Sequence, residues 1–124
     1  MKHTVIDAAD LAALERETWT EAQFQRAVIA LAHAGDWRVA TFRPARVRRG
    51  GREIYETPVG ADGRGWPDLH LTRPRSRTLY RELKTDRGRL TPEQAAWGAW
   101  LMSCDEDWAV WRPRDWTEIL ETLR

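Results

Sequence analysis

Two carboxylates and one lysine stand at the ends of two short predicted strands, in the stretch GWPDLHLTRPRSRTLYRELKT at residues 65–85. Asp68 opens the first strand, and Glu82 and Lys84 close the second. Because alternate residues of a strand share a face, Glu82 and Lys84 point to the same side of the sheet. A short crossing brings Asp68 near Glu82. Strand ends of this kind normally carry apolar residues, so the three charges predict a site.

Two converging carboxylates suit a hard divalent cation, Mg²⁺ or Mn²⁺, with water completing its coordination. We expect Asp68 and Glu82 to bind it and the backbone carbonyl of Leu83 to add a ligand. Such a cation can polarise a phosphodiester oxygen and lower the pKa of a bound water. Lys84 is then expected to orient that water and stabilise developing negative charge. The alternative is an ordinary hairpin with Glu and Lys at an exposed edge.

A helix over residues 20–33 is predicted to supply a third acid. Thr20 and Gln23 form a capping box at its start, and Gly35 ends it. Glu21 and Gln25 fall on the helix's apolar arc, which contains Phe24, Val28, Leu31 and Ala32. Glu21 either reaches the cation through water or is a first-turn acid favoured by the helix dipole. Gln25 either holds Glu21 or contacts a phosphate.

The remaining elements predict a sheet flanked by helices. A short helix is expected at 8–17, strands at 37–44, 67–72, 78–85 and 107–113, and helices at 91–103 and 115–123. The order of helix, three strands, helix, strand and helix predicts an α/β fold with a mixed sheet. Residues 45–65 are rich in Gly and Arg and predict a long loop, with a short hairpin as one alternative.

Two of these helices carry expected caps. Thr91 caps the helix at 91–103 with Gln94 as its capping-box partner, and Asp115 caps the last helix with Glu118. The apolar stripe of the helix at 91–103 is expected to consist of Trp97, Trp100, Leu101 and Cys104.

The distribution of charge favours an anionic partner. The net charge is +1, but residues 38–89 carry 14 basic and 6 acidic side chains. A basic middle between acidic ends is what a phosphate backbone would select, although a solvated arginine-rich loop is the alternative. Apart from Lys2, Lys84 is the chain's single lysine beside 18 arginines. The residues expected to contact DNA are Gln25, Arg43, Arg46, Arg48, Arg49, Arg52, Arg87 and Arg89.

Length and cysteine content limit the other possibilities. At 124 residues the chain fits one domain. Cys104 is alone, so neither a disulfide framework nor a cysteine metal site is expected. Asp7 and Asp10 interrupt the apolar residues near the start, and no apolar run approaches a membrane span. We therefore expect no signal peptide, no membrane contact and a reducing, cytoplasmic location.

The stretches WPDLHL, RELKTDRGRLTPEQAAW and TEAQFQRAVIALAHAGDWRVATFRPAR together resemble the VRR-NUC family of the restriction-endonuclease-like PD-(D/E)xK superfamily. This family has small stand-alone members in bacteria and phages. The resemblance covers residues 20–124 and leaves 1–19 as an N-terminal extension. It implies an αβββαβ core and a cell that is bacterial or phage-infected.

The resemblance also implies roles for individual residues. Asp68, Glu82 and Lys84 match the PD…ExK residues, and Glu21 matches the acid from the first helix. Gln94 matches the glutamine that follows the ExK strand. We expect Gln94 to serve the site as well as the capping box only if its side chain turns away from the backbone.

The implied function is a Mg²⁺- or Mn²⁺-dependent DNA endonuclease without a small-molecule cofactor. Some family members resemble structure-specific nucleases and junction resolvases acting as homodimers, so branched or duplex DNA is the expected partner. One active site in a small chain would require a dimer to cut two strands symmetrically. Two alternatives stay open, which are a non-catalytic nucleic-acid-binding module and an assembly protein with a tryptophan-rich surface.

Overall fold

The computed structural model describes residues 7–42, 45–56 and 59–124. Its elements, in chain order, are α1 (Ala8–Glu17), α2 (Glu21–Ala34), β1 (Arg38–Thr41), β2 (Ala45–Arg49), β3 (Arg52–Glu56), β4 (Leu69–Thr72), β5 (Leu79–Leu83), α3 (Pro92–Ser103), β6 (Asp107–Trp111) and α4 (Trp116–Leu123). A 3₁₀ turn, Pro113–Asp115, precedes α4. The described part of the chain contains no helix of the length and apolarity that crossing a membrane requires.

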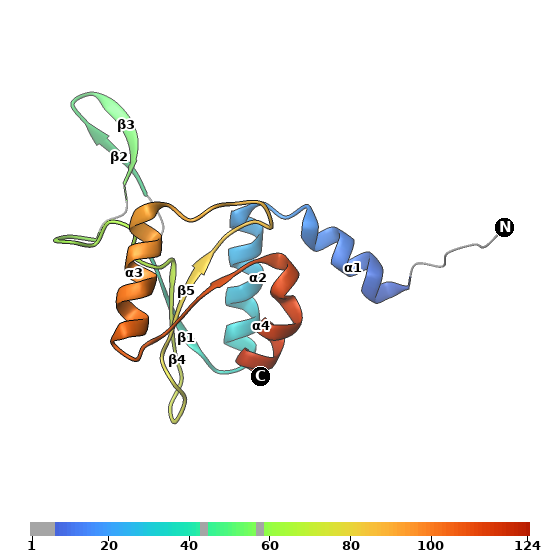
Figure 1. Cartoon of the computed structure of the whole chain (residues 1–124). Helices are drawn as coiled ribbons and strands as arrows, with labels where there is room; N and C mark the ends of the chain where they lie inside the picture. Colours follow the sequence, from blue (N-terminus) through green and yellow to red (C-terminus); the bar gives the residue numbers. More distant parts are fainter. Residues whose placement is uncertain (1–6, 43–44, 57–58) are drawn as a thin grey trace.

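Four strands form a mixed sheet in the order β1-β4-β5-β6. β4 pairs antiparallel with β1 and β5, whereas β5 and β6 are parallel and α3 makes the crossover between them. Helices α2 and α4 lie on one side of the sheet and α3 lies on the other (Figure 1). The predicted α/β class and mixed sheet flanked by helices are therefore confirmed.

The main core lies between the sheet and the α2–α4 layer. The arc predicted for α2 is confirmed at Phe24, Val28 and Ala32, none of which is exposed. The core also contains Leu69, Leu71, Leu79, Leu83, Trp111, Ile119 and Leu123. Each large apolar side chain buried in this way contributes roughly 1.5–3 kcal/mol. This packing fixes α2 against the strands and so fixes the helix start that carries Glu21.

The strands are shorter than the sequence predicted. Trp37 was expected to start β1, but its backbone N–H donates to Ala32 O at 3.0 Å and closes the end of α2. Its indole Nε1 also donates to Leu123 O at 3.0 Å. Trp37 therefore joins the two helices, and β1 begins one residue later.

The apolar stripe predicted for α3 was wrong in part. Trp100 is 65% exposed, and Cys104 is also exposed. The buried residues of α3 are Gly98 and Leu101. A Cβ atom on Gly98 would lie 2.4 Å from the Trp108 indole, so the missing side chain lets α3 pack directly on β6. This close approach determines which face is buried and leaves Trp100 in solvent.

The capping box predicted for α4 was also wrong. Asp115 makes no side-chain cap to α4 and lies in the 3₁₀ turn. Its Oδ2 accepts from the backbone N–H of Arg112 at 2.9 Å. The carboxylate therefore stabilises the start of the 3₁₀ turn, which the sequence pattern had not predicted.

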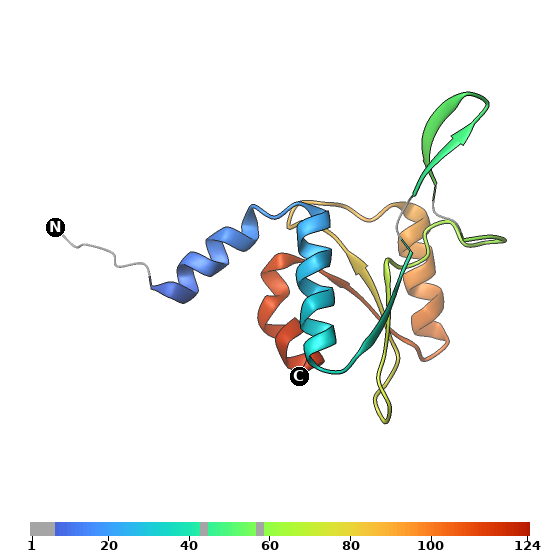
Figure 2. The same ribbon diagram turned by 180° about the vertical axis from the view of Figure 1, so that it is seen from behind.

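Two segments extend from the body. Strands β2 and β3 pair as an antiparallel hairpin whose turn residues Gly50 and Gly51 have φ values of +56° and +78°, as a type I′ turn requires. The hairpin rises from the end of the molecule where α2 and α3 begin (Figure 1). Helix α1 occupies the predicted range 8–17 and extends from the start of α2 (Figure 2).

Candidate active site

Four of the five predicted catalytic residues line one hollow of about 340 Å³. They are Glu21 from the start of α2, Asp68 before β4, Lys84 after β5 and Gln94 in the first turn of α3. The other lining residues are Phe42, Arg64, Gly65, Trp66, Thr91 and Glu93. The fifth predicted residue, Glu82, is 1% exposed and is connected to this hollow through Gln94. We call this hollow the candidate active site.

Asp68 is held by the backbone of the neighbouring strand. Its Oδ2 accepts from the backbone N–H of Leu83 at 2.9 Å, and its side chain is largely buried. Its own carbonyl accepts from Phe42 N at 2.8 Å. These two bonds fix the carboxylate beside the end of β5, as the predicted crossing required. The expected contribution of the Leu83 carbonyl to a metal stays a prediction.

Glu82 is the least exposed acid in the described part of the chain. Its Oε1 accepts from Gln94 Nε2 at 3.0 Å, whereas its buried Oε2 has no hydrogen-bond partner among the described residues. A buried carboxylate oxygen without a partner is costly, because nothing replaces the water it has lost. When Glu82 is ionised, this oxygen therefore favours an additional positively charged or hydrogen-bonding group beside it.

Gln94 uses both ends of its amide at once. Its Oε1 accepts from Thr91 N at 2.9 Å, and its backbone N–H donates to Thr91 Oγ1 at 3.1 Å, which completes the predicted capping box. Its Nε2 meanwhile donates to Glu82. The expectation that the side chain must leave the backbone to serve the site was therefore wrong. One amide carries both contacts because it has an acceptor at one end and donors at the other.

The Glu82 carboxyl is difficult to ionise in its buried position next to Asp68. Burial raises the pKa of Glu82 to about 9, helped by the hydrogen bond that the protonated carboxyl shares with Asp68, by the Asp68 charge and more weakly by Glu21, while Lys84 acts in the opposite direction. Two carboxylates in one buried place cannot both ionise without a compensating charge. A divalent cation would supply that charge and hold both groups ionised.

The donor set fits a cation that keeps much of its water. Among the residues that the structure describes, no three His, Cys, Asp or Glu side chains form a group that could hold a metal ion. The carboxylates near the hollow are the Asp68–Glu82 pair together with Glu21 and Glu93, which also line it. Mg²⁺ is commonly bound by one or two carboxylates, with water and substrate phosphate completing its octahedron. The pair and the unpartnered Oε2 of Glu82 fit this pattern.

Glu82→Gln is expected to stabilise the metal-free protein at pH 8. Below pH 4.5 the Glu82 carboxyl is protonated in both folded and unfolded chains. Because its folded pKa is about 9 and its unfolded value 4.5, wild-type stability is lost as the pH rises between these values. Glutamine carries no charge, so the variant keeps that stability. We expect its melting temperature in EDTA to exceed that of wild type by several degrees at pH 8.

The control for this measurement is Glu121→Gln, which alters an exposed acid paired with Arg124. It should shift the melting temperature little at pH 8. An equal or lower melting temperature for Glu82→Gln than for wild type at pH 8 would contradict the assigned charge state of Glu82.

The predicted DNA contacts are spread over three places. Arg46, Arg48 and Arg49 belong to β2 and Arg52 begins β3, while Arg43 lies outside the described residues. Arg87 and Arg89 are exposed in the loop after β5. Arg112 secures this loop by donating to Thr85 O at 2.7 Å and Gly88 O at 2.6 Å. Gln25 is 8% exposed, which leaves little of its side chain open to a phosphate.

The sequence did not predict that Arg64 and the aromatic residues Phe42 and Trp66 would line the candidate active site. The Arg64 side chain is 87% exposed and lies 4.0 Å from Glu93 at the start of α3. Trp66 packs edge-on against Phe42 and Trp97, with ring centroids 6.2 and 4.9 Å apart. The glycines around Arg64 were the available signal, because they mark a segment that runs close to other backbone.

Comparisons with known proteins support the α/β fold described above. No family model matches the chain, and no curated protein matches it. A solved structure described as a VRR_NUC domain is similar, with a TM-score of 0.56 and 17% sequence identity. The match covers 82% of this chain and 94% of that structure. The chain therefore has the fold of a VRR_NUC domain.

Proposed function

We propose that this chain is a divalent-metal-dependent DNA endonuclease that hydrolyses phosphodiester bonds. One observation carries the proposal, which is the buried Asp68–Glu82 carboxyl pair next to a hollow that Lys84 lines, in which ionised Glu82 has no partner for its Oε2. The VRR_NUC fold supports it, as does the resemblance of these residues to the PD…ExK pattern. The proposed setting is the cytoplasm of a bacterial or phage-infected cell.

Each residue has a distinct task in the proposed reaction. Asp68 and Glu82 would hold a Mg²⁺ or Mn²⁺ ion, with Glu21 reaching it through water. When bound, the ion polarises the phosphate and lowers the pKa of water. Lys84 places a positive charge in the same hollow, where it stabilises negative charge on the phosphate oxygens. Gln94 keeps Glu82 turned toward the ion through its 3.0 Å hydrogen bond.

The proposed substrate is branched DNA, such as a junction or a flap. The arginine-bearing hairpin rises from the end of the molecule where α2 and α3 begin, close to their site residues (Figure 1). A chain with one site would cut both strands of a symmetric junction as a homodimer. The second candidate is a non-catalytic nucleic-acid-binding module, which the basic residues 38–89 favour equally.

Cleavage of end-labelled four-way junction, flap, nicked and linear duplex DNA tests the proposal. Each substrate is incubated with Mg²⁺, with Mn²⁺ and with EDTA. We expect products with either metal and none with EDTA, with the branched substrates cut faster than linear duplex. Salt-sensitive binding without metal-dependent products on any substrate would reject the nuclease and favour the binding module.

A further inference from the structure

A second hollow adjoins the candidate active site along the start of α3. It measures about 420 Å³ and is lined by Asp62, Arg64, Glu93, Ala96, Trp97 and Trp100. Arg64 and Glu93 line both hollows, so the two are adjacent. Its volume lies within the roughly 300–1,000 Å³ typical of sites for small organic groups. We call it the side hollow.

The inner wall of the side hollow is held in place by a hydrogen bond and by close packing. The indole Nε1 of Trp97 donates to Asp62 O at 3.0 Å, and its ring packs edge-on against Trp66. Gly65 has a φ of +89°, and a Cβ atom there would lie 2.5 Å from the Glu93 carbonyl carbon. The segment before β4 therefore lies directly on the start of α3. Binding against a preformed wall does not have to order it first.

The outer part of the side hollow is aromatic and open. Trp100 is 65% exposed, the highest value among the exposed large hydrophobic side chains of the described residues. An exposed tryptophan face stacks on a nucleobase of any sequence and contributes roughly 1–3 kcal/mol per base. The planar guanidinium of Arg64, at the boundary of the two hollows, can also stack on a base or contact a phosphate.

The charges at the rim decide which part of a nucleotide fits. Asp62 and Glu93 are acidic and repel a phosphate, and only Arg64 opposes them, at 4.0 Å from Glu93. Carboxylates accept hydrogen bonds from the amino groups of bases. The side hollow is therefore suited to a neutral base rather than to the sugar–phosphate backbone.

We propose that the side hollow binds one unpaired nucleobase of the DNA strand that enters the candidate active site. The base stacks on Trp100 while its phosphate passes Arg64 toward Asp68. A base in intact duplex is paired and stacked, so it cannot enter without an unpairing cost. The side hollow would thus select DNA with an unpaired nucleotide next to the cut. This inference rests on the proposed function for the placement of the strand.

The test compares binding of DNA with and without the unpaired base. Fluorescence anisotropy in EDTA measures the affinity for blunt duplex and for duplexes with a 5′ or a 3′ flap. Each flap carries either a normal base or an abasic sugar at its first unpaired position. Wild type is expected to bind at least one base-containing flap more tightly than its abasic form. Trp100→Ala should weaken that binding about tenfold and leave abasic and blunt duplex binding unchanged.

Met102→Ala is the matched control, because Met102 is 52% exposed on the same helix but does not line the side hollow. It should change none of these affinities. The inference is overturned if Trp100→Ala weakens all substrates equally, or if neither flap shows base-dependent binding. Because EDTA prevents cleavage, this binding assay is independent of the cleavage assay. Base-dependent binding here, together with no metal-dependent products in the cleavage assay, would reject the nuclease but not the proposed base-binding role of the side hollow.

Discussion

Asp68→Asn is expected to reduce metal-dependent cleavage by roughly a hundred- to a thousandfold. The substitution removes one of the two carboxylates that would bind the cation. A bound metal contributes several kcal/mol of transition-state stabilisation, and each 1.36 kcal/mol changes the rate about tenfold. Asparagine keeps an oxygen that can accept from Leu83 N, so the fold should survive. Single-turnover cleavage of the preferred branched substrate in Mg²⁺ measures the effect.

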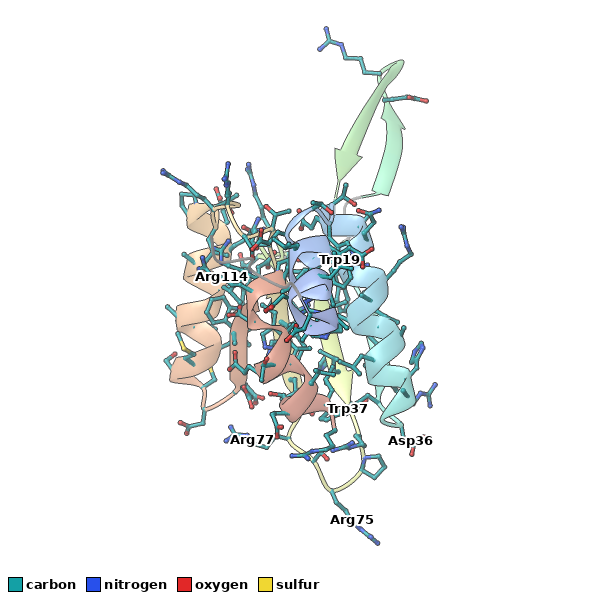
Figure 3. The ribbon with its side chains drawn as sticks, turned by 90° about the vertical axis from the view of Figure 1, so that its right-hand side faces the viewer. Trp19, Asp36, Trp37, Arg75, Arg77 and Arg114 are labelled. Carbon is teal, nitrogen blue, oxygen red and sulfur yellow. The ribbon has the colours of Figure 1, made fainter. Side chains whose placement is uncertain are left out.

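The matched control is Asp36→Asn, which makes the same chemical change at an exposed turn far from the hairpin (Figure 3). Asp36 has a φ of +64°, a conformation that asparagine also tolerates. The Asp36→Asn variant should cleave DNA at the wild-type rate. If Asp68→Asn also cleaved at that rate while melting like wild type, the acid pair would not be the catalytic centre.

Lys84→Gln is expected to slow single-turnover cleavage by about a hundredfold while leaving Mn²⁺ affinity close to that of wild type. Lys84 lines the candidate active site and acts on Glu82 through its charge. A positive charge aimed at the reacting phosphate is felt most in the transition state, which changes the rate more than binding. Lys84→Arg keeps the charge but not the compact ammonium, so it should recover activity only in part.

Arg75→Gln removes one positive charge from the turn at the opposite end of the molecule and serves as the control (Figure 3). Arg75→Gln should leave the single-turnover cleavage rate and the Mn²⁺ affinity unchanged. A Lys84→Gln variant that lost Mn²⁺ binding in proportion to its activity would act through the metal instead. That result would assign Lys84 to holding the site together rather than to the reacting phosphate.

The sequence could predict where Glu21, Glu82, Lys84 and Gln94 lie because their placement depends on local rules. Strand alternation puts Glu82 and Lys84 on one side, and the capping box puts Gln94 at the first turn of α3. The helical period likewise turns Glu21 toward the sheet. Each rule acts within a few residues, so it could be applied before the fold was known. The roles of these residues remain predictions that the experiments above test.

Features that depend on contact between distant elements could not be predicted. The buried face of α3 depends on Gly98 lying against Trp108, which belongs to β6. Trp37 lies outside β1 because its backbone N–H donates to Ala32 O in α2 and its indole Nε1 donates to Leu123 O. The pKa of Glu82 likewise depends on burial beneath elements that are separate in the sequence. None of these contacts leaves a periodic pattern in the residues.

Mn²⁺ binding tests the central claim, that Asp68 and Glu82 together hold a divalent cation, most directly. Electron paramagnetic resonance of free Mn²⁺ would be recorded with wild type, Asp68→Asn and Asp36→Asn, each with a non-cleavable phosphorothioate form of the preferred DNA. Because DNA phosphates also bind Mn²⁺, the DNA without protein gives the baseline. We predict that wild type and Asp36→Asn remove more Mn²⁺ from solution than this baseline and that Asp68→Asn does not. Equal Mn²⁺ uptake by all three proteins would place the cation elsewhere and contradict the account.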